Sequence, residues 1–243
     1  MELVRTRISD GRVLALMESF LKQRVLDELR QWEPSESGTP YGAVISRLLA
    51  NLYLHPLDLL LQQSGRERIR YADDFVILCR SRAEAEATLS QIEQWIGGAG
   101  LLLHPEKTRL VDLTQEGAGF DFLGYHFRRG GKRWPRKKSV QKLKEALRGK
   151  TRLYNGKSVR AIVSEINPTL RGWYGYFCHS ILTGFEQIDG WLRERLRSIL
   201  RRRSGRRGRA RGTEHQRWTN ASFARHGLFS LHAARATASQ SHR

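Results

Sequence analysis

The chain has 243 residues, with 43 Lys and Arg against 24 Asp and Glu, which gives a formal net charge of +19. Apolar residues make up 40% of it, enough for a folded core, so disorder throughout is excluded. Two cysteines exclude a disulfide framework and a cysteine-based zinc cluster, and no stretch approaches the ~20 apolar residues of a membrane span. A chain this basic is expected to bind a polyanion, with nucleic acid first, and without a signal peptide we expect it in the cytoplasm.

Two helical patterns open the chain. Residues 12–32 carry apolar side chains at helical spacing after a start signal at Ser9-Asp10-Gly11, which predicts one helix. Residues 43–61 predict a second, and Pro56 predicts a kink or a stop near His55.

An acidic pair, Asp73 and Asp74, follows between two strand-like segments. Residues 68–71 and the apolar run 75–79 predict the strands of a β-hairpin, with the acids at its turn. A hard divalent cation prefers oxygen ligands, so such a turn is a candidate Mg²⁺ site. The alternative interpretation of an Asp-Asp pair alone is a solvated acidic turn.

The remaining first half alternates helix and strand signals. Ser81 and Glu84 form a capping box for a helix that Gly97-Gly98 ends. Strand signals follow at 101–103, 109–111 and 120–127. This order predicts an α/β or α+β layer structure with helices packed on one sheet, and we take α+β as the fold class.

From residue 137 onward the pattern is helical and basic. We place a boundary at the Arg- and Gly-rich segment 128–133, which looks like a linker. The expected division is 1–130, then a helical domain at 131–203, then a basic, partly flexible tail at 204–243. The arginine run at 201–211 is too charged to bury and predicts a flexible arm.

Several motifs, in order along most of the chain, resemble the C-terminal part of group II intron reverse transcriptases, which also act as maturases. They are Gly38-Thr39-Pro40 with Val44-Ile45-Ser46, the segment 48–55, Tyr71-Ala72-Asp73-Asp74-Phe75, the segment 103–108, Phe122-Leu123-Gly124-Tyr125, and Asn167-Pro168 with the segment 170–177. The resemblance implies a partial polymerase palm, an antiparallel sheet with packed helices, followed by an all-α basic thumb and maturase domain.

The resemblance also implies residue roles. Asp73 and Asp74 would hold the two Mg²⁺ ions of nucleotidyl transfer, and Lys107 would lie near the leaving group. Nucleotide-binding residues would be Tyr41, Gly42 and Ala72. The primer grip would be the turn Phe122, Leu123, Gly124 and Tyr125, where Gly124 lets the backbone approach the primer. The alternatives are an ordinary surface lysine at 107 and a plain β-hairpin with an aromatic core pair.

Basic side chains on and beside one predicted helix form a candidate RNA-binding face. They are Lys137, Lys138, Lys142, Lys144, Arg148 and Arg152, and we add Arg171 from the maturase-like segment. A solvated helix face gives the same pattern, but the net charge favours RNA. The aromatic cluster Trp173, Tyr174, Tyr176 and Phe177 is expected in the core, with base stacking as the alternative.

Two departures from the family bear on activity. A further catalytic Asp and the fingers would lie before Met1, so we expect an N-terminally truncated palm; Tyr41 also stands where the family has Gln. The expected function is RNA-directed DNA polymerase and maturase, with polymerase activity of this chain alone absent or very weak. Expected partners are group II intron RNA, an RNA template with a DNA primer, and dNTPs. The competing hypotheses are a non-catalytic RNA-binding maturase remnant and a decayed product that hardly folds; the oligomeric state is open.

Overall fold

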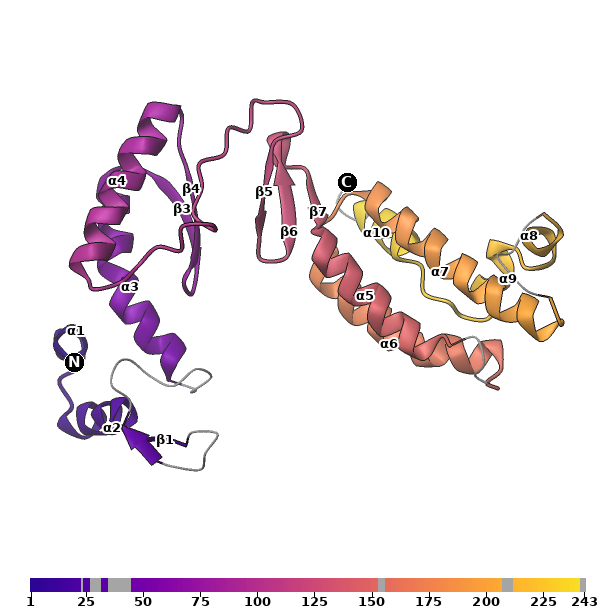
Figure 1. Cartoon of the computed structure of the whole chain (residues 1–243), viewed down its shortest axis with the longest axis horizontal. Coiled ribbons are helices and arrows are strands. Elements are labelled where there is room, and N and C mark those ends of the chain that lie inside the picture. The colour runs from indigo at the N-terminus through magenta and orange to yellow at the C-terminus, as the bar shows by residue number, and fades with distance from the viewer. Residues whose placement is uncertain (23, 27–31, 35–44, 153–155, 207–211, 241–243) are drawn as a thin grey trace. The chain divides into compact units, whose positions relative to one another are not determined.

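The computed structural model describes residues 1–22, 24–26, 32–34, 45–152, 156–206 and 212–240 (Figure 1). The chain divides into two compact units, residues 1–110 and 111–243. The boundary expected at 128–133 instead falls within a sheet of the second unit, as described below. The functional division into palm, helical domain and tail stays a prediction.

The first unit begins with α1 (Glu2–Arg5) and α2 (Gly11–Leu21), followed by a short antiparallel pair, β1 (Arg24–Leu26) with β2 (Trp32–Pro34). Asp10 caps α2 by accepting hydrogen bonds from the backbone N–H of Arg12 and Val13, at the start that the sequence predicts. The helix predicted to continue to residue 32 was wrong, because it ends at Leu21 and the chain turns into β1.

A layer of two helices and a hairpin follows. It consists of α3 (Ser46–Gln63), β3 (Glu67–Tyr71), β4 (Asp74–Leu78) and α4 (Arg82–Gly98). Figure 1 shows α3, the β3–β4 hairpin and α4 as neighbouring elements. Their core gathers Leu57 and Leu61 of α3 with Ile92 and Ile96 of α4, and side chains of β4 pack against them. The predicted helix start is confirmed, since Ser81 Oγ accepts from the Glu84 N–H. The Glu84 carboxylate accepts from the N–H of Arg80, one residue before the N-cap, and not from that of Ser81 as in a capping box.

Pro56 does not stop α3, which continues for seven residues beyond it. Proline removes one backbone donor, the one that would bond the carbonyl of Leu52. Burial of Leu54, Leu57 and Leu61 on the same helix offsets that loss.

The strands predicted at 101–103 and 109–111 were wrong, because both segments are irregular. Gly100, at a φ of 69°, ends the preceding helical turn, and the Leu101 N–H returns to the carbonyl of Ile96. Leu103 packs on the core, whereas Leu102 is 96% exposed. An apolar triplet thus forms no strand here, since the described residues offer it no partner strand.

The second unit begins with a three-stranded antiparallel sheet, β5 (Gly119–Phe122), β6 (Tyr125–Arg128) and β7 (Arg133–Pro135). The segment predicted as a linker is the turn between β6 and β7, including the short 3-10 helix η1 (Arg129–Gly131). Its basic residues therefore belong to a folded turn.

Helices α5 (Lys137–Lys150), α6 (Val159–Phe177) and α7 (Leu182–Arg203) form the body of this unit, as the periodicity predicts. Phe177 is buried in their core, and Trp173 and Tyr174 pack against it, which confirms the expected core role of these three aromatics. Tyr176 differs, because it is 56% exposed.

The tail at 204–243, which we expect to be partly flexible, is helical over much of its described length. It contains α8 (Thr213–Arg217), α9 (Asn220–Arg225) and α10 (Leu231–Gln240), and Phe223 and Leu231 are buried in the core of the unit. Arg201–Arg203 end α7. In the described part of the chain, no helix is both long enough and apolar enough to span a bilayer.

Candidate functional site

Asp73 and Asp74 lie at the tip of the β3–β4 hairpin. Tyr71 pairs with Asp74, so Ala72 and Asp73 are the two turn residues, and both carboxylates are exposed. Ala72 has a φ of 56°. A two-residue turn with positive φ at its first position normally takes glycine there, so alanine holds this turn at a cost in free energy.

Arg70 ties this turn to α3. Its Nη1 donates to the carbonyl of Ala72 at 2.9 Å and to Oδ1 of Asn51 at 2.8 Å. Its Nε and Nη2 both bond the carboxylate of Asp58, with Nε 3.1 Å from Oδ1. The side chains of Arg70 and Asp58 are only 14% and 16% exposed, so the pair is a largely desolvated anchor for the strained residue.

Asp58 also bonds Arg68 through its Oδ1, at 3.3 Å from Nε. The hydrogen bond from Arg70, followed by its charge and the contact with Arg68, holds the pKa of Asp58 below its usual value despite partial burial. Asp58 is therefore ionised at neutral pH. One carboxylate on α3 holds two strand arginines on the face opposite the exposed Tyr71.

The predicted primer-grip turn also contains a residue other than glycine at positive φ. Leu123 and Gly124 connect β5 to β6 with φ values of 47° and 81°. In the part of the chain that the structure describes, Ala72 and Leu123 are the only residues other than glycine with positive φ, and each lies in a turn that the sequence marks as functional. Such strain concentrates at functional sites.

Side chains and backbone of the helices hold this second turn. The Tyr176 hydroxyl donates to the carbonyl of Leu123 at 2.7 Å, and the carbonyl of Gly124 accepts from Ser139 Oγ and the Arg136 N–H. Tyr125 in turn donates to the carbonyl of Tyr176, and burial raises the pKa of Tyr125, so this donor stays protonated. A side chain added at Gly124 would contact Phe177 at 3.5 Å.

The donor set at the first turn suits Mg²⁺. Within the described ranges, no group of three or more His, Cys, Asp and Glu side chains could hold a metal ion. Mg²⁺ characteristically uses one or two carboxylates and takes its other oxygens from water and substrate phosphates. Asp73 and Asp74 supply two carboxylates and leave the other coordination positions of an ion open to water and phosphate.

The structure gives less information on the other residues predicted for the polymerase site. Lys107 is exposed in a turn closed by its own N–H and the carbonyl of His104, and its side chain makes no hydrogen bond or ion pair with a described residue. Tyr41 and Gly42 lie outside the described residues. The structure thus joins Ala72, Asp73 and Asp74 in one turn but leaves the roles of Lys107, Tyr41 and Gly42 as predictions.

The predicted RNA-binding side chains of α5 divide into two groups. Lys137, Lys138 and Lys142 are exposed, whereas Lys144 and Arg148 lie over the ring of Trp191 on α7, at 5.4 and 5.7 Å from its centre. This contact orders two cations while leaving them accessible. The remaining two, Arg152 and Arg171, are exposed, and Arg171 lies over the ring of Phe229.

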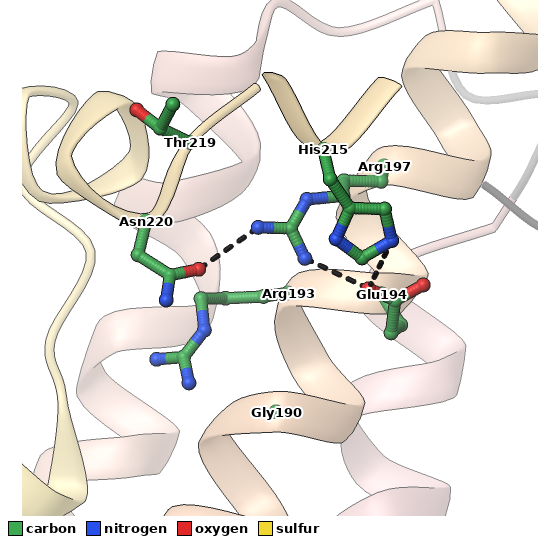
Figure 2. A pocket seen from close by; sticks show the side chains of 7 residues that line it. All are labelled: Gly190, Arg193, Glu194, Arg197, His215, Thr219 and Asn220. Atoms are coloured by element: carbon green, nitrogen blue, oxygen red, sulfur yellow. Dashed lines mark hydrogen bonds and ion pairs between the residues drawn. The ribbon is translucent and has the colours of Figure 1, made fainter. Parts of the chain in front are cut away.

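A pocket of about 400 Å³ between α7, α8 and α9 is lined by polar side chains (Figure 2). Its central group is the buried guanidinium of Arg197, which bonds Glu194, Asn220 and the carbonyl of Trp218 at 2.8–2.9 Å. His215 lies 3.2 Å from Glu194. These polar groups satisfy one another's hydrogen-bonding capacity, and their hydrogen bonds connect α8 and α9 to α7.

Sequence reasoning missed the anchoring roles of Asn51, Asp58, Arg70 and Tyr176. The signal for the first three was Arg68-Ile69-Arg70, which puts two arginines on the inward face of a strand and requires an acidic partner there. Nothing in the sequence pairs Tyr176 with Leu123, which lies 53 positions away.

Residues 4–127 match the family model of reverse transcriptase (RNA-dependent DNA polymerase), and residues 140–218 match that of the group II intron, maturase-specific domain. Protein YkfC of Escherichia coli K12 is 28% identical in an alignment covering 55% of this chain and 43% of that protein. The group II intron-encoded protein LtrA of Lactococcus lactis subsp. cremoris is 41% identical over 25% of this chain and 10% of its own. The chain spans less than half the length of these relatives.

Proposed function

The chain belongs to the reverse transcriptases of group II introns, and from this premise we propose that it supplies the metal-binding turn and the RNA-binding part of an RNA-directed DNA polymerase and maturase. The observation that supports this most directly is the coincidence of backbone strain with the two predicted functional turns. Ala72 and Leu123 each adopt a positive φ, and a hydrogen bond from a side chain outside the turn fixes each carbonyl.

In this proposal Asp73 and Asp74 place negative charge where Mg²⁺ and a triphosphate meet. Bound Mg²⁺ would lower the pKa of a primer 3′-hydroxyl and neutralise the leaving pyrophosphate. Arg70 holds the turn backbone at Ala72, so the carboxylates keep their position without moving when an ion binds. The exposed ammonium of Lys107 would stabilise departing charge.

The grip turn would hold the primer strand. A side chain at Gly124 would face Ser139 and Phe177, so glycine lets this turn pack closely on the helices, and Tyr176, Ser139 and Arg136 fix its two carbonyls. A rigid turn positions a primer terminus better than a mobile one, because a misplacement of about 1 Å costs on the order of 100-fold in rate.

The test is metal binding by the purified chain, with Mn²⁺ in place of Mg²⁺ and the free ion counted by electron paramagnetic resonance. We expect Asp73→Asn and Asp74→Asn each to weaken Mn²⁺ binding and to abolish any primer extension. Glu93→Gln is the matched control, since Glu93 is exposed on α4 and its side chain makes no hydrogen bond or ion pair with a described residue. Equal Mn²⁺ binding by all four proteins would refute the metal-binding turn.

The exposed cations of α5 favour a second candidate function, a non-catalytic RNA-binding maturase. Lys137, Lys138 and Lys142 have no acidic partner among the described residues, a state suited to phosphate contacts. Intron-RNA binding and splicing support that survive the two Asp variants but fail in Lys137→Gln/Lys138→Gln would favour this candidate.

A further inference from the structure

We propose that the turn between β6 and β7 forms, with the loop 113–118, a groove that binds the phosphates of a nucleic-acid strand. The groove encloses about 460 Å³ within the second unit. Arg128, Arg129, Lys132 and Trp134 line it together with the loop. The proposal rests on the proposed function only in taking nucleic acid as the partner.

The basic side chains of the groove outnumber its acidic ones. Arg128, Arg129 and Lys132 are all exposed, and none makes an ion pair with any residue that the structure describes. Glu116 is the single acid among the described lining residues. Three cations within five residues repel one another, and a bound polyanion relieves that repulsion.

The groove is also built to hold its cations in place. The Arg128 guanidinium lies over the Trp134 ring, 5.4 Å from its centre, which fixes its plane but leaves its N–H edges available for a phosphate. The turn is closed by a hydrogen bond of 2.9 Å from the Arg128 N–H to the carbonyl of Lys132, around Gly130 and Gly131, both at positive φ. These glycines adopt that conformation without strain and so bring the three cations onto one tight turn.

The groove lies at the opposite end of β6 from the predicted primer-grip turn. β6 has four residues, which span roughly 13 Å. A stacked strand rises about 3.4 Å per nucleotide, so about four nucleotides cover that distance. The sheet therefore offers two contacts to one strand, the second of which no family motif marks.

The test is equilibrium binding of a fluorescent single-stranded oligoribonucleotide to the full chain across a series of KCl concentrations. We expect Arg129→Gln/Lys132→Gln to weaken binding roughly tenfold near physiological salt and to reduce the slope of log K against log salt by about 1.4, since each phosphate contact on a single strand contributes about 0.7. Arg128→Lys keeps the charge but loses the planar stack, so we expect weaker binding with an unchanged slope.

The matched control is Arg160→Gln/Arg225→Gln, which removes two exposed arginines of the same unit whose side chains make no hydrogen bond or ion pair with a described residue. We expect a change within about twofold in its affinity and no change in slope, because these charges lie outside the groove. Thermal unfolding checks that every variant folds.

The outcomes separate the groove from the proposed function. If Lys137→Gln/Lys138→Gln weakens RNA binding but the groove variant behaves like the control, the groove proposal fails and the proposed function stands. If the wild-type chain binds no RNA, both fail.

Discussion

Replacing Arg70 by Gln should loosen the acidic turn without disturbing the rest of the first unit. The substitution removes the ion pair with Asp58 and the hydrogen bonds to Asn51 and Ala72. It leaves a largely desolvated carboxylate with one remaining partner, Arg68, at 3.3 Å.

The magnitude follows from that geometry. Removing one partner of a buried ion pair costs about 3–5 kcal/mol, and the remaining Arg68 lowers the cost, so we expect the free energy of opening the hairpin to fall by about 2–3 kcal/mol. Because about 1.4 kcal/mol is a factor of ten, backbone amides of β3 and β4 should exchange with solvent about 30 to 140 times faster.

Hydrogen exchange with mass spectrometry on peptides covering 57–78 measures this directly. The control is Arg109→Gln, an exposed arginine of the same unit whose side chain makes no hydrogen bond or ion pair with a described residue. The free energy of opening should fall less in the double variant Arg70→Gln/Asp58→Asn than the sum of the falls in the two single variants, since both substitutions remove the same interaction. Exchange in Arg70→Gln within twofold of the control would refute the anchoring role.

Three further changes probe the other anchors. Tyr176→Phe removes the exposed hydrogen bond to Leu123 and should lower the free energy of unfolding by no more than about 1 kcal/mol, measured in urea, while a loss above about 3 kcal/mol would contradict this assignment. Lowering the pH from about 4 should destabilise the β3–β4 hairpin, because the folded pKa of Asp58 is depressed: its contribution is complete above the unfolded value near 3.9 and is lost as pH falls through the folded value. The unfolding temperature, measured between pH 2 and 6, should therefore change less with pH in Asp58→Asn than in the wild-type chain. An equal pH dependence of the unfolding temperature in the two proteins would refute the linkage. Asp189→Ala should cost about 2–4 kcal/mol and release α10, because Asp189 is 3% exposed and accepts from Ser230 Oγ and two backbone N–H groups; unchanged exchange in residues 228–240 would exclude that role.

The sequence predicts the features of this fold that depend on local order. The helices α3 to α7 and both hairpins follow from apolar spacing, caps and turn residues, which act within a few positions. A strand, by contrast, requires a partner elsewhere in the chain, so the apolar triplet at 101–103 could not be decided from its own composition.

In the candidate site, too, the local features could be predicted from the sequence and the contacts between distant residues could not. The acidic turn is visible as four consecutive residues, but its anchor Asp58 lies 12 positions before Arg70 on a different element. The last helices escape prediction because five- to ten-residue segments are too short to be stable alone and form only against α7.

The hydrogen bonds to the final helices also set an order of assembly during synthesis. Asn167, Asp189 and Arg197 lie on α6 and α7, and their partners come from residues 218–232. Until residue 232 has left the ribosome, the Asp189 carboxylate lacks the donors that permit its burial. The first unit can thus fold while the chain is still being translated, whereas the second can complete its folding only after residue 232 has emerged. Until then the aromatic side chains of its core are exposed to chaperones.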